Sequence, residues 1–267
     1  MKQTQNATFR FFHRFLSAAL VPLLAMLICV GADAQSEAAA ASNVFNVLIF
    51  SKTLGFRHDS IPNSIAAIRE LGARHRFAVD ATEDSGAFTP ANLQRYQVVV
   101  FLSTTGDVLN SKQNEAFKQF VLNGGGFAGI HGAIFGPSAT EEKWGWYGEV
   151  CCCAFTNHSS ILPATVKIED PIHLSTAGLP ARWQRTDEWY NFTGTPRGCA
   201  RVLATVDEAT YSGGTMGGDH PIAWCRPVGK GRMWYTALGH TKESFADPLF
   251  LQHILGGIQS VVGTNHP

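Results

Sequence analysis

The segment VFNVLIF, residues 44–50, decides the fold of this chain because it is short, branched and almost entirely apolar. Such a strand suits a parallel sheet whose two faces are both covered by helices. A polar loop over residues 51–59 follows it, and a helix is expected from Pro62, with Gly72 as its end. The sequence therefore opens with a strand, a loop and a helix.

The same alternation continues along the chain. Strands are expected at residues 77–81, 98–102 and 127–130, with a helix from Asn110 or Ser111 to Gly124 between the last two. The later part adds expected strands at residues 164–168, 201–205, 222–226 and 233–237, and a closing helix from residue 247. Gly229 and Gly231 indicate a hairpin between the last two strands.

This pattern predicts an α/β fold with a doubly wound, mostly parallel sheet in a single domain. In such sheets ligands bind outside the carboxyl ends of the strands. His131 directly follows the strand at residues 127–130, so the sequence places it at that edge.

The first 34 residues have the features of a secretory signal. Lys2, Arg10 and Arg14 precede an apolar run over residues 16–30, and small residues allow cleavage near Ala34. The run is shorter than the roughly 20 residues that a membrane span needs. We therefore expect a secreted or periplasmic protein without a membrane anchor after processing, with a linker at residues 35–43 and one domain at residues 44–264.

Charge and cysteine content exclude two classes of protein. The 21 basic and 21 acidic side chains balance, so no basic stripe is available for phosphates and nucleic acid is not an expected partner. Cys29 lies in the signal, which leaves five cysteines, three of them consecutive at residues 151–153. An odd number cannot pair fully, so we expect no disulfide scaffold and at most one bridge, with Cys199 or Cys225 as a partner.

The sequence lacks the motifs of two other enzyme classes. The G-x-S-x-G turn of serine hydrolases is missing, and a histidine stands at the corresponding strand end. The three glycines at residues 124–126 precede a strand instead of joining a strand to a helix, so they do not form a phosphate-binding loop, and no nucleotide cofactor is expected.

Titratable side chains recur at the ends of the expected strands and in the loops between them, which is typical of a functional site. These residues are Arg57, His58, His131, His158, Asp187, Glu188, His220 and His240. Aromatic residues accompany the same loops and suit the apolar face of a sugar ring. They include Trp146, Tyr147, Trp189 and Tyr190.

Several motifs together resemble the ThuA-like, or trehalose-utilisation, family. They are FSKTLGFRHDSIPNSIAAIRELG (residues 50–72), GGGFAGIHGA (124–133), WYGEV (146–150), RTDEWYNF (185–192), DHPIAWC (219–225) and YTALGHT (235–241). The resemblance implies a flavodoxin-like fold of the class I glutamine amidotransferase type. His131 takes the place of the nucleophilic cysteine of amidotransferases, so that activity should be lost. The family is linked to trehalose and related disaccharides, through 3-keto sugars and a hydrolytic or isomerising step. Cys152, Cys153 and Ala154 depart from the expected GARF-like pattern.

Three functional hypotheses follow. In the first, a hydrolase or isomerase acts on a disaccharide, a glycoside or its 3-keto derivative, and His131 exchanges protons with the sugar together with Glu188 or Asp187. The sugar would be bound by Arg57, His58, Trp146, Tyr147, His158, Trp189, Tyr190, His220 and His240.

The second hypothesis is a metal-dependent sugar hydrolase that holds a divalent ion such as zinc. Its ligands would come from His131, His158, Glu149, His220 and His240, with Asp187 as an alternative carboxylate. The third is a sugar-binding module without catalysis. The expected partner is in each case a small-molecule sugar, and the sequence leaves open whether the chain forms a homo-oligomer.

Overall fold

The computed structural model describes residues 45–134 and 141–263. The expected signal and linker lie outside these residues. The strands are β1 (Phe45–Phe50), β2 (Phe77–Thr82), β3 (Val98–Leu102), β4 (Gly126–Ile130), β5 (Phe155–Ile168), β6 (Arg182–Phe192), β7 (Arg201–Val206), β8 (Pro221–Val228) and β9 (Gly231–Thr236). The helices are α1 (Ile61–His75), α2 (Pro90–Leu93), α3 (Ser111–Leu122), α4 (Glu141–Cys151) and α5 (Pro248–Val261).

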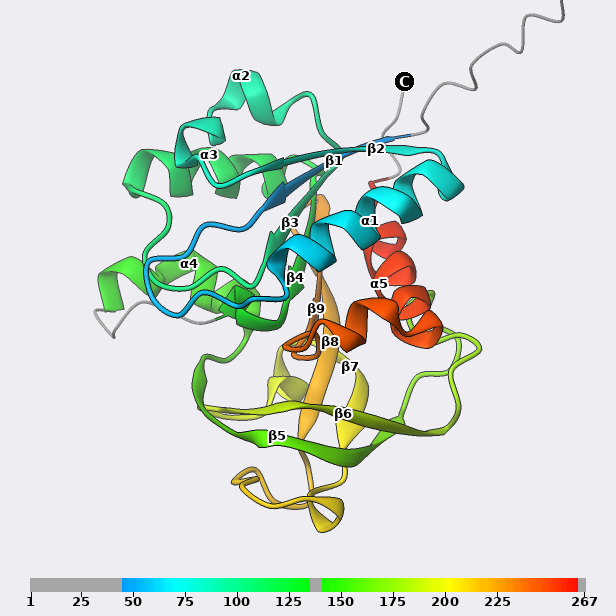
Figure 1. The fold of residues 1–267 in the computed structure, drawn as a ribbon. Coiled ribbons are helices and arrows are strands. Elements are labelled where there is room, and N and C mark those ends of the chain that lie inside the picture. Colours follow the sequence, from blue (N-terminus) through cyan, green and yellow to red (C-terminus); the bar gives the residue numbers. More distant parts are fainter. Residues whose placement is uncertain (1–44, 135–140, 264–267) are drawn as a thin grey trace, which may run out of the picture. The chain divides into compact units, whose positions relative to one another are not determined.

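All the strands of the described residues form one sheet, in the order β2-β1-β3-β4-β9-β8-β7-β5-β6. The first five strands, from β2 to β9 in this order, are parallel to one another. We call these five the parallel half. The inner four, β1, β3, β4 and β9, are mostly buried, as β3 shows with five buried residues, because helices cover them, whereas the edge strand β2 has only Phe77 buried. Figure 1 shows α1 and α5 together on one side of these strands, and α3 and α4 on the other. The predicted α/β fold is thus confirmed.

The other four strands, β8, β7, β5 and β6, extend the sheet with antiparallel pairing, and we call them the antiparallel half. The expected hairpin joins β8 to β9, with Gly229 in a left-handed conformation at its turn. The sequence did not predict β6 or α4. Strand β5 is also much longer than the expected residues 164–168, because its first part pairs with β6. The sheet is therefore more mixed than the doubly wound pattern alone predicts.

Helix ends follow local chemistry, with one correction. Asn110 caps α3, since its side chain accepts the Gln113 amide and the Gln113 side chain accepts the Asn110 amide. Asp247 caps α5, since its side chain accepts the Leu249 amide. Helix α1 does not end at Gly72 as expected, but continues to His75, and Arg76 adopts the left-handed capping conformation. Gly72 instead allows close packing, because a Cβ there would lie 2.5 Å from the carbonyl oxygen of Phe77.

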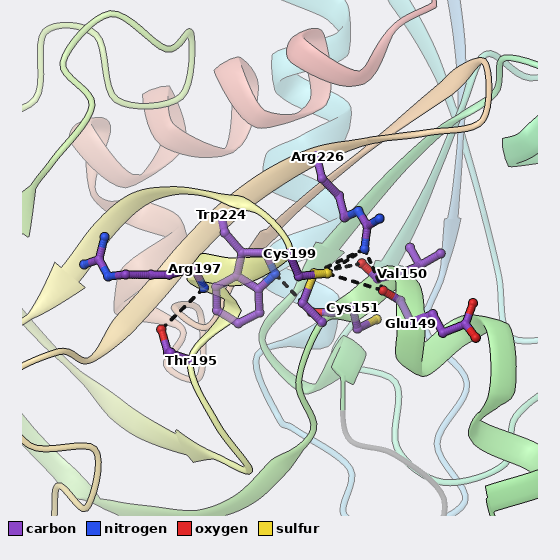
Figure 2. The surroundings of a disulfide bond; sticks show 9 residues. Glu149, Val150, Cys151, Thr195, Arg197, Cys199, Trp224 and Arg226 are labelled. Carbon is purple, nitrogen blue, oxygen red and sulfur yellow. Dashed lines mark hydrogen bonds between the residues drawn. A yellow bond between two sulfur atoms is a disulfide. The ribbon is translucent and has the colours of Figure 1, made fainter.

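A disulfide joins Cys152, just after α4, to Cys199, just before β7. Figure 2 shows the Arg226 side chain directed at this bond, where it also donates to the carbonyl of Glu149 over 2.8 Å. Cys151, Cys153 and Cys225 are free thiols. The prediction of one bridge with Cys199 or Cys225 as partner is therefore confirmed for Cys199. No helix among the described residues is long and apolar enough to span a membrane.

Candidate active site: a cluster of three histidines and a glutamate

Four side chains from distant parts of the sequence meet at one point. His58, His131, Glu188 and His240 each offer one nitrogen or oxygen atom, and these four atoms lie within 4.8 Å of one another. Three of the residues are buried and His240 is partly buried. We call this group the histidine cluster.

His131 is fixed by the backbone around it. It directly follows β4, and its φ of 52° lies in the left-handed region, which a residue other than glycine rarely adopts. The Nδ1 atom lies 2.7 Å from the carbonyl oxygen of Ala237. Because a carbonyl only accepts, Nδ1 donates its hydrogen there. In the neutral ring, Nε2 therefore carries a lone pair, and it faces Glu188 and His240 at 3.6 and 3.2 Å.

Glu188 lies in β6 and uses both carboxylate oxygens. Oε2 is 3.1 Å from Nδ1 of His240, and Oε1 is 3.0 Å from Nδ1 of His158. A register shift in β5 between His158 and Ile161 accompanies this arrangement, since Ile161 is the residue paired with Glu188. His158 is about half exposed and thus stands at the outer side of the glutamate.

Charges and burial shift the pKa values of this group. Burial raises the pKa of Glu188, but interactions with His131, whose Nε2 lies 3.6 Å from Oε2, and with His240 outweigh it and bring the pKa to about 2. Burial lowers the pKa of His240, yet its bond to Glu188 and the nearby carboxylates raise it above the ordinary value. His58 is different, because burial and the neighbouring histidines lower its pKa to about 3. The cluster thus combines an ionised carboxylate with a neutral buried imidazole.

Asp187 supports the cluster instead of joining it. Its buried carboxylate accepts the backbone amides of Gly239 and His240 over 2.9 and 3.0 Å. The hydroxyl of Ser244 donates to the same carboxylate, and Arg185 lies 3.9 Å away. Asp187 therefore holds the loop after β9 that carries His240, which is a positioning role.

The aromatic residues expected to bind a sugar ring lie mostly inside the protein. Trp189 and Tyr190 are buried, and the Tyr190 ring packs on His131 with 4.2 Å between centroids. Trp146 is half-buried and packs against Phe117, while Tyr147 donates to the carbonyl of Ala133. These four side chains pack against His131 or within the core, so they offer little exposed ring surface to a ligand.

Phe56 is an aromatic residue at the cluster that the sequence reasoning missed. It is 64% exposed, and its ring lies edge-on to His58 and parallel to His240, at centroid distances of 4.9 and 6.4 Å. Leu54 in the same loop is 61% exposed. The position of Phe56 directly before Arg57 and His58 is the sequence signal that could have identified it.

Three other candidates lie away from the cluster. Arg57 forms a bidentate ion pair with Glu83 on the surface. His220 is buried, with Nδ1 2.7 Å from Glu208 and Nε2 2.8 Å from the carbonyl of Tyr190. Glu149 is exposed on α4 and is not among the grouped side chains.

Comparisons with known proteins agree with the fold. One solved structure, a ThuA-like protein from Bacteroides uniformis, is 24% identical with a TM-score of 0.73, and the match covers 85% of this chain and 94% of that one. A ThuA-like protein from Parabacteroides merdae is 21% identical with a TM-score of 0.66, covering 84% and 92%. A cytoplasmic protein from Salmonella typhimurium is 14% identical with a TM-score of 0.59, covering 82% and 100%.

A search among curated proteins finds no match. The family model ThuA, described as trehalose utilisation, matches residues 46–260, which is most of the chain. The matched segment contains every motif on which the resemblance rested. This chain belongs to the ThuA family.

Proposed function

We propose that this chain is an exported carbohydrate-processing enzyme that acts on a disaccharide or glycoside, or on its 3-keto derivative, by proton transfer. The histidine cluster is the observation that carries the proposal. Histidine and carboxylate are the pair best suited to exchange protons with a sugar near neutral pH. A structural role would not need three imidazoles around one carboxylate.

The position of the cluster supports this proposal. His58, His131 and His240 lie in the segments that directly follow β1, β4 and β9, which are strands of the parallel half. Their carboxyl ends share one edge of the sheet, where ligands bind in folds of this kind. Glu188 reaches the same point from β6. The groups therefore converge where a substrate would be expected.

An apolar surface beside the cluster fits a sugar ring. Thr105 fixes the loop that carries this surface, since its carbonyl accepts the Leu54 amide and its hydroxyl donates to the Phe56 carbonyl, over 2.7 and 2.9 Å. A pyranose ring has apolar C–H faces and polar edges, so it can lie on Phe56 while its oxygens reach the cluster. Exposed apolar side chains held rigidly beside polar groups commonly mark a binding site.

Proton transfer is sufficient for both reactions considered. In a 3-keto glycoside the carbonyl group acidifies the hydrogen on C2, and a base that takes this proton leaves an enolate. Return of a proton at another position gives an isomer. Alternatively, the electron pair expels the oxygen on C1 as an alcohol, which takes up a proton, and addition of water to the new double bond completes a net hydrolysis. Both routes need a base and an acid close together.

The disulfide supports the proposed location. Bonds of this kind persist in secreted and periplasmic proteins and are rare in reducing compartments. The Cys152–Cys199 bond is therefore in accord with an N-terminal export signal that is cleaved near Ala34.

The test is incubation of the mature protein with trehalose, sucrose and their 3-keto forms, with products identified by mass spectrometry. We expect turnover of at least one of these sugars by the unmodified protein, and its loss in Glu188→Gln. Glu83→Gln is the matched control, because it makes the same chemical change in a surface ion pair. Binding of a sugar without any product would favour a sugar-binding module and contradict the proposed catalysis.

A further inference from the structure

We propose that the histidine cluster binds one divalent transition-metal ion, zinc being the best match. The ligands are Nε2 of His131, Nδ1 of His240, Oε2 of Glu188 and a ring nitrogen of His58. This inference deepens the proposed function, since it names what the same site holds. It replaces the set expected from the sequence, because His158, Glu149 and His220 do not belong to the group.

The spacing of the ligand atoms matches a zinc ion. The three measured separations are 3.1 Å from His240 to Glu188, 3.2 Å from His131 to His240, and 3.6 Å from His131 to Glu188. Zinc bonds to nitrogen and oxygen of about 2.0–2.1 Å place tetrahedral ligands about 3.3–3.4 Å apart. An ion therefore fits among these three atoms with little movement, and His58 completes the set from within 4.8 Å.

The lone pairs in the cluster call for a cation. When the His131 ring is neutral, its Nε2 is an acceptor, since Nδ1 donates to the Ala237 carbonyl. The atom opposite it, Oε2 of Glu188, is also an acceptor. Nδ1 of His240 lies within reach of both, but it carries one hydrogen at most and can satisfy only one of them fully. A metal ion attracts all three lone pairs at once.

His58 provides an independent observation. It is 4% exposed, and its buried Nδ1 has no hydrogen-bond partner. A buried polar atom without a partner is costly and usually has a functional reason. Its ring lies edge-on to the rings of His131 and His240, at 4.6 and 5.0 Å between centroids. Coordination of an ion would give this buried Nδ1 atom of His58 the partner that it otherwise lacks.

The surroundings of the ligands have the features of a metal site. Ligating histidines commonly donate their other N–H to a backbone carbonyl, as His131 does to Ala237. Ligating carboxylates are also held by outer hydrogen bonds, and His158 holds Oε1 of Glu188. The Asp187 carboxylate fixes the backbone of His240. Three of the four ligands, His131, Glu188 and His240, are thus oriented without an ion.

An ion at this point would change the proton path of the proposed reaction. It would attract the carbonyl oxygen of a 3-keto sugar and so stabilise the negative charge that follows loss of the C2 proton. Because the three imidazoles and Glu188 would fill a tetrahedral site, the ion would expand to five ligands to take this oxygen or a water, and a water so bound would exchange the proton.

Metal binding can be measured without a substrate. Mature protein purified without a histidine tag is treated with a chelator, dialysed and titrated with Zn²⁺ by calorimetry, and ion content is measured by elemental analysis. Co²⁺ serves as a second probe, because an intense visible absorption indicates tetrahedral coordination. We expect one ion per chain, and binding at least about tenfold weaker in His58→Ala and Glu188→Gln. His75→Ala is the matched control, since His75 is exposed at the end of α1.

The outcomes separate the two proposals. Absence of stoichiometric Zn²⁺ and of a Co²⁺ spectrum in the unmodified protein would overturn the metal site, and so would equal affinity in the cluster variants and His75→Ala. Turnover that persists after chelation would then leave the proton-transfer function standing. One bound ion without turnover of any sugar would support the metal site and reject the enzymatic function. If a variant fails to fold, the stoichiometry and Co²⁺ spectrum of the unmodified protein still decide.

Discussion

The two halves of the sheet supply the histidine cluster in different ways. The parallel half contributes His58, His131 and His240 from three separate strand ends, because parallel strands all finish at one edge. The antiparallel half contributes Glu188 from within a strand. The imidazoles are thus brought together by topology alone, whereas the carboxylate depends on the pairing of two long strands.

A second pair of histidine and glutamate in the antiparallel half makes this difference clearer. Nε2 of His220 lies against the Tyr190 carbonyl, its Nδ1 lies against Glu208 and the hydroxyl of Tyr211, and Glu208 also accepts the Met216 amide over 2.7 Å. These polar atoms satisfy one another within the protein. In the histidine cluster, by contrast, Nδ1 of His58 has no partner, and Nε2 of His131 and Oε2 of Glu188 both approach the same atom, Nδ1 of His240. The histidine cluster therefore contains a buried nitrogen that a ligand or an ion could pair with, whereas both nitrogens of His220 already have partners.

Neutralising one carboxylate in each half tests this difference directly. We expect Glu188→Gln to lower kcat on the active sugar by about 10²–10⁴-fold, because it removes the carboxylate charge of the cluster, which either exchanges the proton or holds the ion that does so through a bound water. Glu208→Gln should leave kcat within a few-fold and lower the free energy of unfolding by about 1–3 kcal/mol, since it weakens a buried hydrogen-bond network. Steady-state kinetics and urea unfolding of both variants measure these effects. Equal losses of kcat would remove the distinction between the two pairs.

The sequence predicted the parallel half better than the antiparallel half. Strand β3 was found with its correct bounds, because a continuous apolar run has few alternative structures. Strand β6 was missed, since RWQRTDEWYNF carries charges in both its exposed and its buried positions. Helix α4 was missed as well, and Gly145 interrupts its helical geometry. In both segments, tertiary contacts override the local pattern.

The same contrast holds for the candidate site. His131 could be placed at the sheet edge because it directly follows a recognisable strand. Glu188 was a candidate as a titratable residue expected at a strand end or in a loop, and the structure places it within β6 instead. His58 and His240 could be named, but their contact with His131 depends on the strand order, which the sequence did not give. His220 resembles them in sequence, yet the structure surrounds it with internal partners. Spacing alone cannot distinguish a histidine that is satisfied from one that is not.

The disulfide tests how the antiparallel half is fastened to α4. Cys152 and Cys199 are 47 residues apart, and closing a loop of that length stabilises the folded state by about 2–4 kcal/mol. The double variant Cys152→Ser/Cys199→Ser should lose that amount of unfolding free energy in urea. Cys225→Ser, at a free cysteine, is the matched control and should lose less than about 1 kcal/mol. Identical midpoints for the two variants would show that the bond does not constrain the chain.

His253 gives a pH-dependent test of the contact between the two halves. Its buried ring joins Thr236 of β9 to Ser175, and burial lowers its pKa to about 4. The unfolded chain therefore binds a proton below about pH 6.5 that the folded chain refuses, so stability falls as the pH decreases. This costs the wild-type protein up to about 3 kcal/mol at pH 4.

The variant His253→Asn keeps a donor for the Ser175 carbonyl but cannot be protonated in this range. It should start less stable at pH 7, and its unfolding free energy should fall less between pH 7 and pH 4 than that of the wild-type protein. Parallel slopes of stability against pH would show that His253 becomes charged within the fold.

Phe56 provides the last and smallest expected effect, and it compares an exposed apolar residue in each half. Phe56→Ala should raise KM for the active sugar about tenfold with little change in kcat, because the stacking surface beside the cluster is lost. Phe56→Trp should keep KM near its original value. Ile172→Ala removes a more exposed side chain, between β5 and β6, and should leave KM unchanged. Since both residues are exposed, neither alanine variant should change the unfolding free energy by more than about 0.5 kcal/mol. An equal rise in KM for the two variants would mean that the loop before His58 holds no sugar ring.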